Sequence, residues 1–303
     1  MKNKLLTYLL LLFAVAVAAV EPLTAAEPRE PHVQLDEMVV KPKRVKYSKK
    51  NNPAVDFVRR IMATRDLTDP MQSPYYSYGK YERVNLGLID FDKISAGSRF
   101  GFINEYADTS SLTGRTVINL SVKEKLSDHY FRSSPRTERE VVRAINRHGI
   151  DDITRWDESV QASLMNVLRE VDIYDHDIPV LMNRFVSPLG RLAPDFYKFY
   201  LTDTIADAAS PGDSLVVLTF VPRNVAQYGF NGKLYVAKGD STMFIRRAVL
   251  NVPVTSNVNF ITRMTIDQEF ERAPNGYRTK VKDELTAEFN VLTQSLCGKR
   301  TTI

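Results

Sequence analysis

Aspartates crowd one short stretch of the chain, and they are the residues best suited to bind a metal ion. Asp172, Asp175 and Asp177 lie close together, with His176 between the last two. Carboxylates suit a hard cation such as calcium, but the glycine turn and the distal glutamate of a common calcium loop are missing. We therefore interpret the stretch as a helix-to-loop turn with solvated acids, and metal binding as a weak alternative. No cofactor is expected, because the sequence has neither a phosphate-binding loop nor a dinucleotide fingerprint.

Nucleophiles and histidines form no recognisable catalytic set. The run Ser187-Pro188-Leu189-Gly190 lacks the Gly-x-Ser-x-Gly pattern of a hydrolase. Cys297 is the only cysteine and has no histidine nearby, and none of the four histidines has the spacing of a zinc site. The sequence therefore favours a protein that is not an enzyme. An envelope hydrolase is the alternative, because catalytic groups can be scattered along a chain.

An aromatic block supplies the candidates for ligand binding. The four candidate residues are Phe196, Tyr197, Tyr200 and Asp203. The rings suit a cleft wall, although burial between a helix and a sheet is the favoured interpretation. Asp203 is the acid whose burial would point to a special role.

The first residues predict export from the cytoplasm. Lys2 and Lys4 precede an apolar run that extends to Val20, and small residues around Ala26 suit a signal peptidase. Residues 1–26 are therefore predicted to be a cleaved signal peptide, with an uncleaved membrane anchor as the alternative. We expect the mature chain to lie in the periplasm or at the periplasmic face of the outer membrane.

Residues 27–51 read as an extended basic linker. The net charge of +5 is too small and too dispersed to predict nucleic-acid binding. Six basic residues of the linker are candidates for contact with a membrane or a partner, although a solvated linker is the favoured interpretation. They are Lys41, Lys43, Arg44, Lys46, Lys49 and Lys50.

Residues 52–303 are predicted to form a single α+β domain. A helix is expected over 53–65, where Asn52 can cap and Pro53 fits the first turn. Two more helices are predicted. One begins at a capping box formed by Thr137 and Glu140 and ends at His148 and Gly149. The other is an amphipathic helix over 157–171. Strands are expected over 75–88 and 116–125, with another around 130–131.

The final third alternates apolar and polar residues, as strands do. Five strands are predicted over 214–221, 232–237, 243–252, 259–272 and 277–292, and Asn275-Gly276 is a strong hairpin signal between the last two. Successive hairpins indicate a curved antiparallel meander that resembles a half-barrel. The helices are expected to pack on one face of this sheet and cover its apolar side.

Nine segments, read in order, resemble the domain-of-unknown-function family numbered 5686, from the cell envelope of Bacteroidota-type bacteria. They are 35–42, 47–55, 76–81, 126–130, 172–175, 185–189, 196–204, 230–236 and 257–260. The resemblance implies an envelope protein. Family members often carry a carboxypeptidase-regulatory-like module near the start and an outer-membrane β-barrel at the end, and we expect both to be absent here. At fold level, the meander is also similar to periplasmic lipoprotein carriers.

The leading expectation is therefore an exported, non-enzymatic periplasmic module associated with the outer membrane. Its partner would be a lipid or an envelope protein, bound in the concavity of the sheet. The alternative is a scaffold or assembly partner of an outer-membrane β-barrel, attached through the basic linker.

Overall fold

An open antiparallel sheet of eleven strands dominates the computed structural model of the chain. The structure describes residues 46–90, 101–149, 165–224, 226–256, 258, 260–291 and 294–303. Residues Tyr47–Ile303 form one compact unit. No helix among these described residues is long and apolar enough to cross a membrane. The predicted signal peptide, and with it most of the basic linker, lies outside the described residues.

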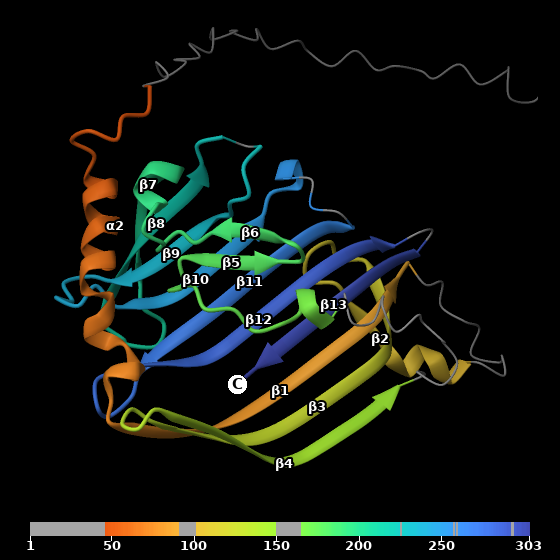
Figure 1. The fold of residues 1–303 in the computed structure, drawn as a ribbon. Coiled ribbons are helices and arrows are strands. Elements are labelled where there is room, and N and C mark those ends of the chain that lie inside the picture. The colour runs from red at the N-terminus through yellow and green to blue at the C-terminus, as the bar shows by residue number, and fades with distance from the viewer. Residues whose placement is uncertain are drawn as a thin grey trace, which may run out of the picture. The chain divides into compact units, whose positions relative to one another are not determined.

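The strands follow one another as a meander over the C-terminal half. The bounds are β1 (Tyr75–Ile89), β2 (Ala107–Thr109), β3 (Thr116–Arg132), β4 (Thr137–Gly149), β5 (Asp177–Val180), β6 (Asn183–Val186), β7 (Tyr197–Ala206), β8 (Ser214–Pro222), β9 (Asn231–Ala237), β10 (Ile245–Val252), β11 (Ile261–Arg272), β12 (Arg278–Val291) and β13 (Gln294–Thr302). The large sheet has the order β2-β3-β1-β13-β12-β11-β10-β9-β8-β7, with β4 also paired to β3, while β5 and β6 form a separate hairpin. The predicted α+β fold with a curved antiparallel sheet is confirmed (Figure 1).

Helices are short and few among the described residues. The bounds are α2 (Pro53–Thr64) and α4 (Ala193–Phe196), with 3-10 turns η1 (Arg65–Thr68), η2 (Pro70–Gln72), η3 (Gly101–Tyr106) and η4 (Val254–Ser256). The side chain of Asn52 accepts a hydrogen bond from the Ala54 amide at 2.9 Å, so the predicted cap and helix start are confirmed. The predicted helix over 157–171 lies mostly outside the described residues, and only 165–167 are seen in helical conformation.

The predicted helix from Thr137 is wrong, because these residues form β4. The strand pairs with β3 along its length, and cross-strand ion pairs join Lys125 to Glu140 at 2.9 Å and Arg143 to Asp128 at 2.6 Å. The Thr137 hydroxyl donates to the Pro135 carbonyl at 3.0 Å. Pairing with an adjacent strand thus overrides a local helix-start signal. The strands predicted over 116–125 and 130–131 are one continuous strand, β3.

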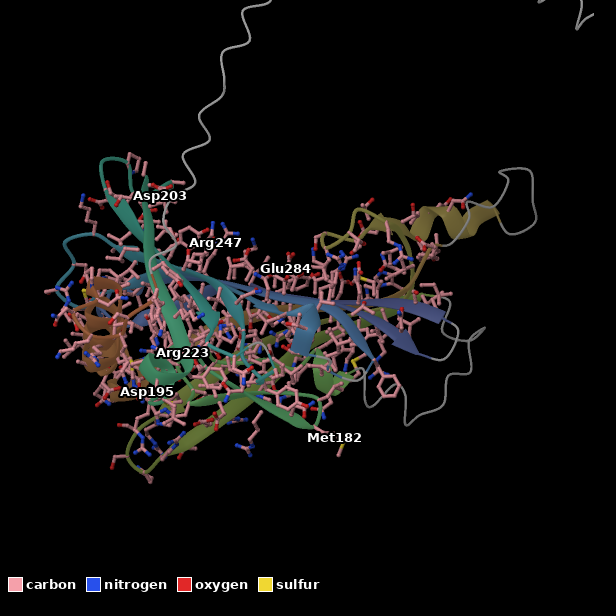
Figure 2. The ribbon with its side chains drawn as sticks, turned by 90° about the horizontal axis from the view of Figure 1, so that it is seen from above. Met182, Asp195, Asp203, Arg223, Arg247 and Glu284 are labelled. Carbon is pink, nitrogen blue, oxygen red and sulfur yellow. The ribbon has the colours of Figure 1, made fainter. Side chains whose placement is uncertain are left out.

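One face of the sheet carries the core. Figure 1 shows the sheet bending from β7 round to β4, with the β5–β6 hairpin in the concavity, which we call the hollow. Side chains of α2, of residues 167–189 and of the sheet belong to one cluster of buried apolar residues. The helices therefore pack on one face of the sheet, as predicted. The opposite face, called the outer face, bears Arg247 and Glu284, whereas Met182 at the hairpin turn lies on the hollow side (Figure 2).

Candidate functional site

The four aromatic-block candidates do not form one site. Tyr197 is fully buried, accepts a hydrogen bond from the Phe230 amide at 3.1 Å and donates to the Val186 carbonyl. Burial raises the pKa of its phenol, which stays neutral. Phe196 packs against the core cluster. Both residues therefore hold the hairpin against β7 and serve the fold, as the favoured interpretation predicts.

Tyr200 and Asp203 lie elsewhere, on the exposed end of β7. Every residue from Tyr200 to Ala206 is exposed, and the large side chains include Leu201 (42% exposed) and Ile205 (38% exposed). Asp203 accepts a hydrogen bond from the Thr204 amide at 2.7 Å and is not buried. Figure 2 shows Asp203 near the projecting end of β7, apart from Asp195 and Arg223. We call residues 200–206 the β7 tip.

The end of the basic linker is packed against β7 beside the β7 tip, where the centres of the Tyr47 and Tyr200 rings lie 5.5 Å apart. The Tyr47 hydroxyl accepts a hydrogen bond from the Phe199 amide at 3.1 Å, and the Arg223 guanidinium lies 5.0 Å from the centre of the Tyr47 ring. Lys49 forms an ion pair with Asp195.

The basic candidates thus have different surroundings. Lys49 is engaged in that ion pair, and Lys46 and Lys50 are exposed. Lys41, Lys43 and Arg44 lie outside the described residues.

The aspartate group behaves as a turn. The Asp172 carboxylate accepts a hydrogen bond from the Tyr174 amide at 2.9 Å, and Asp177 begins β5. The pKa of Asp175 is raised by burial and by the nearby Asp172. No group of three or more potential ligands among the described residues is arranged to hold a metal ion.

Six charged side chains meet on the hollow face of the sheet, next to residues 170 and 171. This charge cluster, which extends from the buried Asp283 and Arg300 to the exposed Glu170, contains Lys80, Glu82, Glu170, Lys280, Asp283 and Arg300. Three cations face three anions, so the cluster is neutral when every group is charged. It joins β1, β12 and β13 to the chain segment that leads into the hairpin.

Asp283 and Arg300 form the most buried part of this cluster. Arg300 Nη2 lies 2.7 Å from Asp283 Oδ2, and Lys280 Nζ lies 3.0 Å from the same oxygen. Arg300 is 1% exposed and Asp283 is completely buried. Asp283 Oδ1 and Arg300 Nε and Nη1 have no hydrogen-bond partner in the described structure. A charge pair with such incomplete hydrogen bonding depends strongly on each partner's charge.

Glu170 connects the segment over the hollow to two lysines. Its carboxylate lies 2.6 Å from Lys280 Nζ and also pairs with Lys80. Burial alone would raise its pKa, but the two ammonium groups outweigh this effect and lower the pKa to about 2. In return, although burial opposes the charge of Lys280, the carboxylates of Asp283 and Glu170 raise its pKa. The neighbouring Val171 carbonyl accepts a hydrogen bond from Gln268 Nε2 at 2.9 Å.

Sequence reasoning did not identify this cluster, although a signal was present. On β12 the hollow-face positions Leu285, Ala287 and Phe289 are apolar, and Asp283 continues the same alternation. On β13 the charged Arg300 likewise follows the position of buried Leu296 at the strand's period of two. Charged residues at positions that the period assigns to a core indicate a buried ion pair.

A polar pocket of about 680 Å³ opens on the outer face. It is lined by Arg115, Arg263 and Glu288, among others. Glu288 is buried and accepts hydrogen bonds from the Ser110 hydroxyl at 2.5 Å and the Thr113 hydroxyl at 2.6 Å. These hydroxyls come from the loop before β3, so Glu288 fixes that loop on the sheet.

Cys297 lies opposite Glu288, on the neighbouring strand β13. Burial, followed by the Glu288 charge, raises the pKa of its thiol to about 11. The thiol is therefore not activated as a nucleophile.

A family model described as "Family of unknown function (DUF5686)" matches residues 58–303. No curated protein matches the chain. A chain in the complex structure of Pseudomonas aeruginosa MucA/MucB is 10% identical, with 83% of this chain and 93% of that chain covered and a TM-score of 0.20. A chain in the crystal structure of MucB in complex with MucA(peri) is 8% identical over the same shares, again with a TM-score of 0.20. Scores this low carry no argument about function.

Proposed function

This chain belongs to the DUF5686 family, and we propose that it is an exported, non-catalytic module of the cell envelope that binds a protein partner. The predicted signal peptide supports export. The binding proposal depends on which apolar side chains of the sheet are covered by the chain itself and which are exposed to solvent. The hollow holds the chain's own hairpin, whereas the β7 tip leaves large apolar side chains in solvent.

The filled hollow argues against lipid carriage there. Ile178, Val180 and Phe185 of the hairpin are buried in the same cluster as Leu285 and Phe289 of the sheet. An acyl chain would have to displace these residues and the Glu170 ion pairs as well. We therefore place ligand binding outside the hollow, in contrast to the expectation from the sequence.

The chemistry of the buried groups supports a role without catalysis. General acid–base catalysis needs a group whose pKa lies near the working pH. Glu170 and Lys280 are held in their charged forms, and the Cys297 thiol is held in its neutral form. None of the three is suited to exchange a proton or attack a substrate near neutral pH.

The β7 tip is the proposed contact surface. It lies at one edge of the sheet, and both of its faces are exposed. An edge strand offers unpaired backbone groups to an extended segment of another protein. Leu201 and Ile205 supply apolar contact area, and Tyr200 adds an aromatic ring. The expected partner is an envelope protein that presents an extended apolar segment.

Photo-crosslinking in whole cells tests the contact. A photoreactive amino acid at Leu201 or Ile205 should capture one dominant envelope protein, while the same probe at the exposed Glu271 of β11 should not. Leu201→Asp with Ile205→Asp should remove capture by a probe at Tyr200, with circular dichroism as the control for folding. Equal capture at Glu271, or none at the β7 tip, would refute the contact.

A second measurement decides between protein and lipid. The full-length protein purified from the envelope is extracted with organic solvent, and the extract is analysed by mass spectrometry. We expect no stoichiometric lipid and no displacement of a fluorescent fatty acid. Lipid bound at one molecule per chain would overturn the proposal and restore the lipid-carrier hypothesis.

A further inference from the structure

Strand β4 is uncovered on both faces and along one edge. All residues from 137 to 148 except Val141 are exposed. Within the described part of the chain, β3 is the only strand that pairs with β4. Val142 and Ile145 are 47% and 53% exposed. A strand of thirteen residues with a free edge is a template for pairing with another chain.

The opposite edge of the sheet is better protected. On β7 the Phe199 amide donates a hydrogen bond to the Tyr47 hydroxyl at 3.1 Å, so this part of the edge is already occupied. Only the β7 tip beyond it is left for the partner segment proposed above. β4 also contains a register shift, but among the described contacts no side chain binds an amide of its edge, and no proline lies within its bounds.

The register with β3 assigns the side chains of β4 to the two faces. Glu140, Val142, Ile145 and Arg147 lie opposite His129, Ser127, Lys125 and Lys123, and so face the hollow side. A register shift at Leu126/Ser127 gives β4 one additional residue, Arg143, whose side chain pairs with Asp128. Val141 and Ala144 therefore lie on the outer face, and the alternation changes phase at Arg143.

Two cations lie side by side on the hollow face of this region. Lys123 is directly opposite Arg147 in the β3–β4 pairing. None of the ion pairs among the described residues includes either side chain. Like charges directly opposite one another destabilise a sheet. An acidic side chain next to Arg147, beyond the free edge of β4, would offset this repulsion.

We propose that β4 pairs antiparallel with β4 of a second copy of this chain, with Val142 opposite Ile145 of the second copy. The two-fold axis then passes between Arg143 and Ala144, perpendicular to the sheet. Glu140 falls opposite Arg147 of the second copy, and this ion pair occurs twice. The Glu140 carboxylate, which also pairs with Lys125 of its own chain at 2.9 Å, then lies next to the Lys123–Arg147 pair of the second copy.

This register also matches the faces of both strands. Val142 and Ile145 both face the hollow side, as do Glu140 and Arg147, while Arg143 and Ala144 both lie on the outer side. A shift by one residue would place hollow-side residues opposite outer-side residues. The additional residue in β4 is therefore what makes the strand complementary to itself. The product is a continuous sheet across two chains.

Sedimentation velocity of the purified full-length protein over a range of concentrations tests the dimer. Wild type should form a reversible dimer, and Arg147→Glu or Glu140→Arg alone should each weaken it at least about tenfold. The double variant Glu140→Arg/Arg147→Glu should dimerise more strongly than either single variant, because the charges are exchanged across the interface. The loss of the Lys125–Glu140 ion pair is common to Glu140→Arg and the double variant. Circular dichroism shows whether each variant folds.

A cysteine crosslink provides the second test. Val142→Cys combined with Ile145→Cys should give an intermolecular disulfide under mild oxidation, and Tyr200→Cys combined with Ile205→Cys on β7 should not. The native Cys297 is buried and does not interfere. A chain that is monomeric at every concentration would overturn the proposal. A dimer whose dissociation constant changes in neither single charge variant would overturn it as well. The experiment uses purified protein alone, so its outcome is independent of the envelope partner proposed for β7.

Discussion

Replacing Asp283 by asparagine should destabilise the protein far more than replacing the neighbouring Glu284 by glutamine. The substitution keeps the shape of the side chain and removes its charge. Arg300, 1% exposed, then loses its acidic partner at 2.7 Å, and Lys280 loses its partner at 3.0 Å. Removing one member of a buried pair costs about 3–5 kcal/mol of unfolding free energy, because the remaining charge is left uncompensated.

Glu284→Gln is the matched control for this substitution. Glu284 is the next residue of β12, on the outer face, and pairs with Lys299 at 3.1 Å where solvent screens both charges. Partly exposed pairs of this kind, whose charges are screened by solvent, contribute less than about 1 kcal/mol. The double variant Asp283→Leu/Arg300→Met should recover most of the lost stability, since it leaves no buried charge unpaired.

Urea unfolding followed by circular dichroism measures all three variants. The midpoint of Asp283→Asn should fall clearly below that of Glu284→Gln at an unchanged slope. If the two single variants unfold at the same urea concentration, the pair is not buried as described and the reasoning is refuted.

Three further outcomes are expected. The pKa of Glu170 in the folded state is lowered from 4.5 to about 2. Its charge therefore stabilises the fold above pH 4.5, and this contribution is lost as the pH falls towards 2. Glu170→Gln should flatten the pH dependence of the unfolding midpoint in this range. The Cys297 thiol, with its pKa raised to about 11, should react with a thiol reagent only after unfolding, and fast reaction of the native protein would contradict its burial. Gly232→Ala should cost about 1–3 kcal/mol, because the added methyl would collide with the backbone of Val249, whereas Gly79→Ala has open space and should stay within about 0.5 kcal/mol in the same urea assay.

The sequence was sufficient where local signals and the tertiary structure agree. The strands of the final third and the Asn275-Gly276 turn follow from alternation and turn chemistry, and Gly276 has a φ of +86°. The helix after Asn52 follows from its cap and its apolar face. In these segments each residue's own preference and its environment favour the same conformation.

Local signals were insufficient where a partner strand decides the conformation. Thr137 to Glu140 has the pattern of a helix start, yet β3 provides a complete pairing edge with opposite charges at Lys125 and Asp128. The aromatic block was not identified as a strand, because Tyr197 and Phe199 are buried by contacts with segments distant in sequence.

Sequence by itself determined the apolar leader, the period of two in the meander and the absence of a recognisable catalytic motif. Only the tertiary structure decided that the chain's own hairpin fills the hollow and that Asp283 meets Arg300. It also decided that β4, within the described part of the chain, pairs with β3 alone and leaves its other edge unpaired. The physical reason is that periodicity along a chain specifies which side chains share a face, whereas burial and pairing depend on which distant segment arrives against that face.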